Sequence, residues 1–231
     1  PDLLDSALHR KRPMKVFTWK GDGDTTLVLS PLDSLAYYKH FLHAGMMTMD
    51  PFTGHIKAWV GGLNYRFFQY DHVKQGKRQP GSTFKPFVYL TALDNGYSPC
   101  DRIRDERVTI KYVENGKDME WQPDNVTREY TGSNMTLRHA MARSVNSVTA
   151  QLTEKVGWEN VAKYANKVGI RSKLLPVPSI GLGSGGDVSV YEMVNAYSTF
   201  VNQGFRTEPL LVTRIEDKNG NVIVQFDPQQ K

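Results

Sequence analysis

Apolar residues follow two different spacings along the chain. Short alternating runs lie mostly towards the two ends, and turns rich in Gly, Asn, Asp or Pro join them in pairs. This arrangement is typical of antiparallel hairpins. The predicted strands cover residues 14–19, 25–29, 46–49, 55–60, 108–113, 118–121, 210–216 and 221–226.

Longer segments between these runs place their apolar residues on one helical face. The predicted helices cover residues 31–43, 82–95, 137–143, 147–156, 158–168 and 190–203. Ser189 and Glu192 have the spacing of a capping box, so the last helix should begin beside Ser189. Residues 1–13 are polar and contain two prolines, which predicts a linker or tail. Because strands do not alternate regularly with helices, the order favours an α+β fold over a parallel doubly wound sheet.

The composition argues against several classes of protein to which the chain could belong. A hydrophobic fraction of 39% and an aromatic fraction of 11% are ordinary for a globular domain, so global disorder is not expected. The formal net charge of +5 is scattered along the chain, and we expect no nucleic-acid partner. The single cysteine, Cys100, cannot form an internal disulfide, and no histidine lies near it in sequence to activate it. No apolar run reaches the roughly 18 residues of a membrane helix.

A candidate nucleophile lies at Ser82, with Lys85 three residues later. A serine hydroxyl needs a base to remove its proton, and a lysine with a lowered pKa can serve. The spacing places both side chains on one helical face, and a helix N-terminus favours the negative charge of an oxyanion. Pro86 has no N–H, so we expect the Ser82 carbonyl to lack its usual helical partner. Ser-x-x-Lys arises by chance about once in such a chain, so a surface serine beside a solvated lysine is the alternative.

A second candidate motif, Ser144-Val145-Asn146, lies at the break between two predicted helices. A serine hydroxyl can relay a proton, and an asparagine amide both donates and accepts, so it can hold a peptide group. The alternative is a loop in which Ser144 and Asn146 cap the helix that follows.

Together the two motifs, about sixty residues apart, resemble the first two of the three that mark serine penicillin-recognising enzymes. The segments around them are similar to the transpeptidase domain of bifunctional (class A) penicillin-binding proteins. Those segments are residues 44–62, 79–86, 121–125, 137–140 and 196–204. The third motif, Lys-Thr-Gly, is absent, so we expect the chain to be truncated before it.

The resemblance covers roughly residues 30–215 and implies the penicillin-binding/serine β-lactamase-like fold, an antiparallel sheet with helices, incomplete at its C-terminal end. It implies a connector over residues 1–43, following an absent glycosyltransferase domain, and a partial transpeptidase domain over residues 44–231. The parent protein is expected to be membrane-anchored, with this part on the periplasmic, extracytoplasmic face of the inner membrane.

The resemblance also implies an activity, serine-type D-alanyl-D-alanine transpeptidation that cross-links peptidoglycan stem peptides. In this reading Ser82 attacks the penultimate D-Ala carbonyl and Lys85 takes its proton. Ser144 relays a proton towards the leaving D-Ala, and Asn146 holds the peptide carbonyl. A β-lactam would acylate Ser82 covalently, and neither a metal nor an organic cofactor is needed.

Other functions stay open at this point. A non-catalytic β-lactam sensor or peptidoglycan-binding scaffold would keep the same two motifs. A serine β-lactamase shares them too, but the chain has no Glu-x-x-Leu-Asn segment of the class A kind. Residues 181–186 match Gly-x-Gly-x-x-Gly, yet prolines interrupt the preceding segment, so nucleotide binding is not favoured. His40 and His43 have no further ligand nearby in sequence, so packing is favoured over metal binding.

Overall fold

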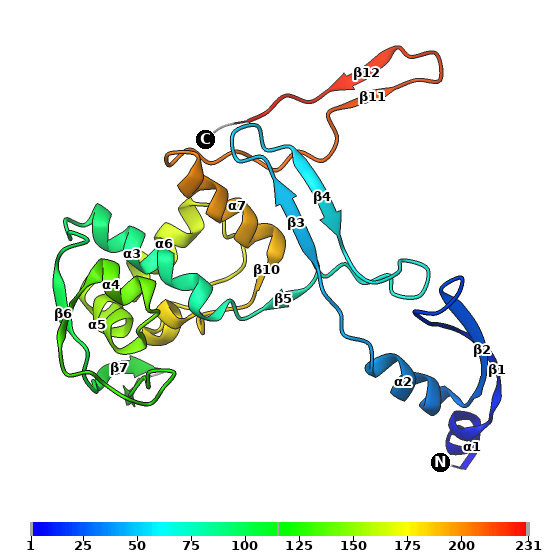
Figure 1. Cartoon of the computed structure of the whole chain (residues 1–231), viewed down its shortest axis with the longest axis horizontal. Coiled ribbons are helices and arrows are strands. Elements are labelled where there is room, and N and C mark those ends of the chain that lie inside the picture. The colour runs from blue at the N-terminus through cyan, green and yellow to red at the C-terminus, as the bar shows by residue number, and fades with distance from the viewer. Residues whose placement is uncertain (1, 115, 230–231) are drawn as a thin grey trace.

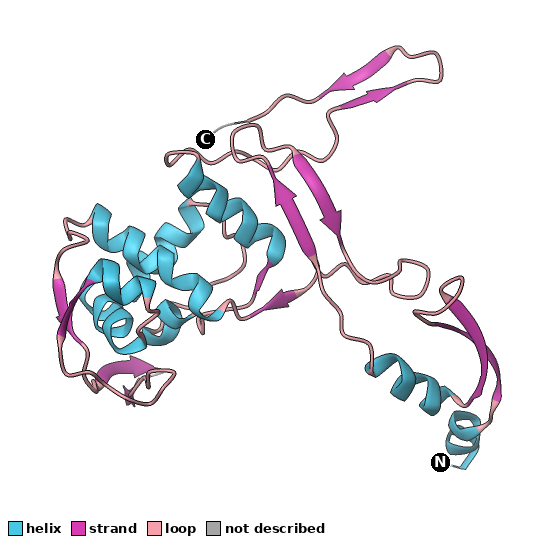
Figure 2. Cartoon of the chain, in the orientation of Figure 1, coloured by secondary structure: helices cyan, strands magenta, loops and turns pink. Residues whose placement is uncertain are grey.

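The computed structural model describes residues 2–114 and 116–229 of the chain. Helices α3 (Lys85–Asp94), α4 (Leu137–Ala142), α5 (Asn146–Val156), α6 (Trp158–Lys167) and α7 (Val190–Val201) gather into one body. The hairpin of β3 (Met46–Met49) and β4 (Ile56–Val60) runs alongside it (Figure 1). At the N-terminal end lie α1 (Asp2–His9), β1 (Arg12–Phe17), β2 (Asp24–Leu29) and α2 (Pro31–Lys39). The hairpin of β11 (Arg214–Glu216) and β12 (Val222–Gln225) projects at the C-terminal end (Figure 1). Colouring by secondary structure shows that strands lie mainly outside the helical body (Figure 2).

The helices match the predicted segments closely in the second half of the chain. They are α1 Asp2–His9, α2 Pro31–Lys39, α3 Lys85–Asp94, α4 Leu137–Ala142, α5 Asn146–Val156, α6 Trp158–Lys167 and α7 Val190–Val201. Two 3₁₀ turns, η1 and η2, cover Gly81–Phe84 and Pro178–Leu182. The capping box predicted at Ser189 and Glu192 is confirmed.

Within the described residues, the strands form six antiparallel pairs. The predicted hairpins are β1 Arg12–Phe17 with β2 Asp24–Leu29, β3 Met46–Met49 with β4 Ile56–Val60, β7 Ile110–Glu114 with β8 Lys117–Trp121, and β11 Arg214–Glu216 with β12 Val222–Gln225. The other pairs are β5 Lys77–Arg78 with β10 Val188–Ser189, and β6 Arg102–Arg104 with β9 Asn134–Thr136. These four strands were not predicted because two or three residues carry no readable alternation. Asn115, in the predicted turn between β7 and β8, lies outside the described residues, as does Pro1.

The prediction of a linker or tail over residues 1–13 is wrong. Residues 2–9 form α1, which packs against α2, and the next residues enter β1. Leu3, Leu4 and Ala7 are good helix formers, and a polar composition does not prevent a short helix that has a neighbour to pack against. Pro13 sits in a two-stranded pair, where a missing N–H can face solvent.

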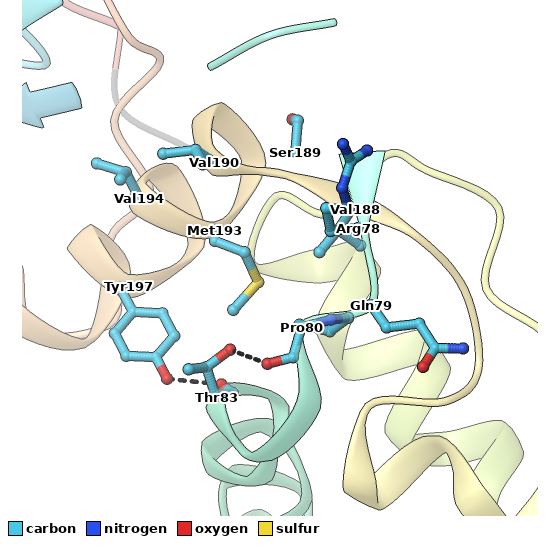
Figure 3. Close-up of a pocket in the computed structure, with 10 residues that line it drawn as sticks. All are labelled: Arg78, Gln79, Pro80, Thr83, Val188, Ser189, Val190, Met193, Val194 and Tyr197. Atoms are coloured by element: carbon cyan, nitrogen blue, oxygen red, sulfur yellow. Dashed lines mark hydrogen bonds between the residues drawn. The ribbon is translucent and has the colours of Figure 1, made fainter. Parts of the chain in front are cut away.

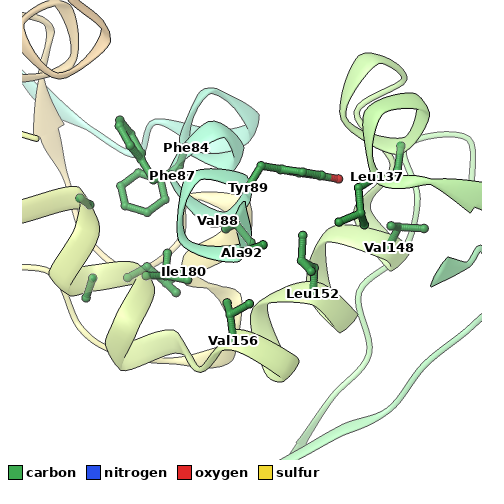
Figure 4. Packing of buried hydrophobic residues seen from close by; sticks show 14 of the residues in the cluster. Phe84, Phe87, Val88, Tyr89, Ala92, Leu137, Val148, Leu152, Val156 and Ile180 are labelled. Carbon is green, nitrogen blue, oxygen red and sulfur yellow. The ribbon is translucent and has the colours of Figure 1, made fainter. Parts of the chain in front are cut away.

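The hydrophobic core is built around α3, which packs against α4, α5 and α6. Phe87 and Val88 of α3 are fully buried against Leu152 of α5 and Ile180 of η2 (Figure 4). Burial of apolar side chains is the main stabilising term in such a body. The start of α3, where the first motif ends, is therefore anchored in the hydrophobic core.

Candidate active site

Ser82 lies in the 3₁₀ turn η1, directly before α3, and is exposed. The prediction of one continuous helix over residues 82–95 is therefore wrong at its first turn. The Ser82 carbonyl lacks its usual i→i+4 partner, as expected, and the Lys85 N–H donates to it in an i→i+3 bond. Pro86 cannot supply the usual i→i+4 bond, and the tighter turn satisfies the carbonyl instead.

The glycine-rich loop packs against this turn. Gly183 has a φ of +84°, and a Cβ there would collide with the backbone of Gly81. The N-terminus of α7 after the loop is occupied by the Ser189–Glu192 capping box. The glycines thus permit a close backbone approach beside Ser82, and a phosphate loop is not required to explain them.

Tyr197 of α7 holds the same turn from the other side. Its hydroxyl donates to the Thr83 carbonyl at 2.6 Å, and the Thr83 hydroxyl donates to the Pro80 carbonyl at 2.6 Å (Figure 3). A largely apolar cavity of about 490 Å³ lies here, and Met193 is among the residues that line it (Figure 3). The turn that carries Ser82 is thus held by α7 as well as by α3.

Lys85 joins the two sequence motifs. Its side chain is only 2% exposed, and its Nζ donates to Ser144 O at 2.6 Å, Ser144 Oγ at 3.0 Å and Asn146 Oδ1 at 2.6 Å. Three of the four predicted site residues therefore meet in space, and Ser82 lies in the turn immediately before Lys85. Among the described residues, the hydrogen-bond partners of the lysine amine belong to the second motif and not to Ser82.

Burial lowers the pKa of Lys85 from 10.5 to about 8. A buried amine loses the hydration that stabilises its charged form, and the three acceptors around it are neutral. A pKa near the pH of the surroundings is what a proton acceptor for a serine hydroxyl needs.

Ser144 has an unusual backbone conformation, with a φ of +54°. Non-glycine residues rarely adopt this left-handed region, and they hold it where the surrounding structure fixes them. Here the conformation lets both the carbonyl and the hydroxyl of Ser144 reach the Lys85 amine. The N–H of Ser144 donates to Met141 O at the end of α4, which holds the residue in place.

Asn146 is the first residue of α5, and the helix is capped from elsewhere in the chain. Val145 is the N-cap and offers no side-chain bond. Asn125 Oδ1 instead accepts from the N–H of Asn146 at 3.0 Å and of Ser147 at 3.1 Å. The alternative that Ser144 and Asn146 cap this helix is therefore wrong.

The Asn146 side chain is oriented by a second contact. Its Nδ2 donates to Asp124 O at 2.8 Å, so its Oδ1 faces the Lys85 amine. Asp124 and Asn125 were predicted only as part of a segment that resembles the family. Asp105, whose carboxylate accepts a hydrogen bond from the Asn125 amide, was not predicted. No local pattern marks Asp105, because its contacts reach 20 to 42 residues along the chain.

The two histidines singled out in the sequence make other contacts. His40 Nδ1 bonds Ala36 O at 2.7 Å, and the ring of His43 stacks on that of His72 with centroids 5.0 Å apart. The described part of the chain contains no group of three or more His, Cys, Asp or Glu side chains placed to hold a metal. It also contains no helix long and apolar enough to cross a membrane.

Comparison with known proteins identifies the family. The model of the penicillin-binding protein transpeptidase domain matches residues 44–231, and that of the penicillin-binding protein middle domain matches residues 2–42. The chain therefore belongs to the penicillin-binding protein transpeptidase family, and the α+β fold predicted from the resemblance is confirmed.

Within this family the chain is similar to proteins named penicillin-binding protein 1A. It is 35% identical to the Pseudomonas aeruginosa protein over 80% of the chain and 22% of that protein, and 31% identical to the Rickettsia typhi protein over 95% of the chain and 27% of that protein. The crystal structure of the Haemophilus influenzae protein aligns with a TM-score of 0.74 at 28% identity, covering 81% of the chain and 27% of that structure. The chain thus spans about a quarter of the length of the curated relatives that it matches.

Proposed function

We propose that this chain carries the acyl-enzyme half of a serine D-alanyl-D-alanine transpeptidase that cross-links peptidoglycan stem peptides. The observation that carries the proposal is the buried Lys85 amine, which contacts Ser144 and Asn146 and follows the exposed Ser82 by three residues. Membership of the transpeptidase family supports it. Stem peptides are then the substrates, and β-lactams are covalent inhibitors of the same serine.

In the proposed acylation, Ser82 Oγ attacks the penultimate D-Ala carbonyl and its proton passes to the neutral Lys85 amine. The carbon–nitrogen bond to the terminal D-Ala then breaks, and Ser144 relays a proton to the leaving amine. Asn146 uses one Nδ2 hydrogen on Asp124 O, so the other is free to hold the substrate carbonyl. An acceptor amine from a second stem peptide attacks the resulting ester and restores the Ser82 hydroxyl.

We also propose the division into a connector over residues 1–43 and a partial transpeptidase domain over residues 44–231. The two family models meet between residues 42 and 44, which supports this boundary. We further propose, as the resemblance to class A proteins implies, that the parent protein carries a glycosyltransferase domain before the connector and a membrane anchor, and works in the cell envelope at the periplasmic face of the inner membrane. Similarity to proteins named penicillin-binding protein 1A supports this.

The test is acylation of the intact gene product by a fluorescent penicillin, read by intact mass. We expect one covalent adduct on the unmodified protein and none on Ser82→Ala. Ser184→Ala is the matched control, since it removes an exposed serine from the neighbouring loop and should keep the adduct. A folded protein that stays unlabelled would contradict the proposal.

A second assay separates an enzyme from a sensor or scaffold, which would also form the adduct. The same proteins are incubated with a D-Ala-D-Ala stem peptide and an amine acceptor, and released D-Ala is measured. Release that depends on Ser82 supports transpeptidation. An adduct without any release would instead favour a non-catalytic β-lactam sensor.

A further inference from the structure

Asp105 is a buried carboxylate directly after β6, and it is only 2% exposed. Its Oδ1 accepts from Ser147 Oγ at 2.6 Å and from Asn125 Nδ2 at 2.8 Å. Its Oδ2 accepts from the N–H of Thr131 at 2.9 Å and from Thr131 Oγ1 at 3.0 Å. Two donors on each oxygen use the accepting capacity of the ionised group on both sides and fix its position.

The charge of Asp105 is stabilised by these donors. Burial alone raises the pKa of the carboxyl, but the hydrogen bonds from Ser147, Thr131 and Asn125 outweigh it and hold the pKa below its usual range. The group is therefore ionised and acts only as an acceptor at neutral pH.

Asp105 decides which way the Asn125 amide points. The amide nitrogen of Asn125 donates to Asp105 Oδ1 and to Glu129 O at 3.0 Å, so both of its hydrogens are used. The amide oxygen must then face the N-terminus of α5, where it accepts from the N–H groups of Asn146 and Ser147. An inverted amide would place its oxygen against the carboxylate and its N–H₂ against two donors.

We propose that Asp105 is a positioning residue for acyl transfer, acting through Asn125 to hold Asn146 so that its Oδ1 meets the Lys85 amine. The proposal rests on the function proposed above. Each link is a hydrogen bond of 3.1 Å or less, from Asp105 to Asn125, from Asn125 to the backbone of Asn146, and from Asn146 to Lys85. Asp105 itself touches no reacting atom, so its effect on the chemistry passes through this chain of contacts.

The first test is Asp105→Asn in the intact gene product, with acylation by a fluorescent penicillin measured against pH. The variant replaces one carboxylate oxygen by an N–H₂ group where four donors converge, so Asn125 loses its charged acceptor and the position of Asn146 is less firmly held. We expect about a tenfold fall in the acylation rate constant, because one buried donor is left without a partner. Since Asn146 accepts from the charged form of Lys85, losing it should also move the acid limb of the profile to lower pH.

Thr131→Val is the matched control. It removes one hydrogen bond to Asp105 Oδ2 and leaves the contact of Oδ1 with Asn125 in place. We expect its acylation rate and its pH profile to stay those of the unmodified protein. A purely structural role of Asp105 would lower the amount of active protein in both variants and leave both profiles where they are.

Asn125→Ala alone keeps the proposal testable if Asp105→Asn does not fold, and the double variant Asp105→Asn/Asn125→Ala adds a test of coupling where Asp105→Asn does fold. If Asp105 acts through Asn125, the double variant acylates about as slowly as Asn125→Ala alone. The proposal would be overturned if the double variant lost the sum of the activation free energies lost by the two single variants. An unchanged acylation rate in Asn125→Ala would also overturn it.

A measurement without any substrate separates this proposal from the proposed function. The titration midpoint of Lys85, followed by NMR of ¹³C-labelled lysine, should fall in Asp105→Asn and Asn125→Ala and stay constant in Thr131→Val. If the midpoints shift but Ser82 is never acylated, the proposed function fails and the positioning chain stands. If Ser82 is acylated and the midpoints stay equal in all three variants, the positioning chain fails alone.

Discussion

The N-termini of α5 and α7 lie in the same helical body but are capped in opposite ways. At α7, Ser189 Oγ accepts from the N–H of Glu192 at 3.2 Å, and Glu192 reaches back to the N–H of Ser189 at 3.0 Å. At α5, the helix has no side-chain cap of its own, and Asn125 supplies the acceptor from about twenty residues away. One cap is local and the other depends on the tertiary fold.

The difference matters because the helix with the remote cap carries a proposed site residue. A local cap holds only its own helix, and its loss is felt mainly as lost stability. The remote cap ties the first residue of α5 to the β6 segment and so fixes Asn146 against Lys85. Loss of the cap at α5 should therefore slow the acylation of Ser82, and loss of the cap at α7 should lower the free energy of unfolding.

The largest effect is expected for Lys85→Met, which removes the α3 amine that lies against the start of α5 and leaves an unbranched side chain one heavy atom shorter. Without a proton acceptor for Ser82, the acylation rate constant should fall by about 10²- to 10⁴-fold. The measurement is penicillin acylation followed by intact mass. Lys155→Met, which changes an exposed lysine of α5, is the control and should acylate normally. A Lys85→Met rate within a few-fold of the unmodified protein would remove Lys85 from the mechanism.

At α7, Glu192→Gln should lower the free energy of unfolding and leave the acylation rate per folded molecule unchanged. The buried Glu192 carboxylate accepts hydrogen bonds from Ser172 and Ser189 and from the N–H of Arg171, and losing its charge should cost about 2 kcal/mol. Chemical denaturation at neutral pH measures the loss, with the exposed Glu154→Gln as control.

The same variant gives a signed pH dependence. Burial raises the pKa of Glu192, but the bonds from Ser189 and Ser172 outweigh it and hold the pKa below its ordinary 4.5. The stabilisation by the charged form is therefore complete above pH 4.5 and is lost as the pH falls through the lowered pKa. The stability gap between the unmodified protein and Glu192→Gln should narrow in acid. A difference in stability that widens in acid would show that the pKa of Glu192 is raised in the folded protein and not lowered.

The smallest effect is expected for Ser189→Ala. Loss of this N-cap should lower the free energy of unfolding by about 1 kcal/mol, and the acylation rate per folded molecule should stay the same. Thermal unfolding and penicillin acylation of the same sample measure both. If Ser189→Ala acylated more slowly and kept its stability, the claim that the α7 cap affects only stability would be wrong.

These two helix starts also show how far the sequence alone can predict such a molecule. The α7 cap was predictable because both partners lie within one turn, and the four hairpins were predictable from alternation and turn residues. The nearness of Lys85 to Ser144 and Asn146 was expected from the resemblance, and the structure brings these three residues together.

What stayed hidden depends on long-range contacts. Asp105 and Asn125 act on residues 20 to 42 positions away, and no local spacing encodes such a bond. The 3₁₀ turn at Ser82 was missed because helix patterns do not register how Pro86 tightens the preceding turn. The contact of Gly183 with Gly81 was likewise visible only once the loop and the turn were folded together.

The most direct test of the proposed mechanism is the pH dependence of Ser82 acylation in the intact gene product. With the pKa of Lys85 lowered to about 8 by burial, the rate constant should rise with pH and reach half its maximum near pH 8. The rise should depend on Lys85 and disappear in Lys85→Met. A rate that stays constant as the pH passes through 8 would contradict the role of Lys85 as the base.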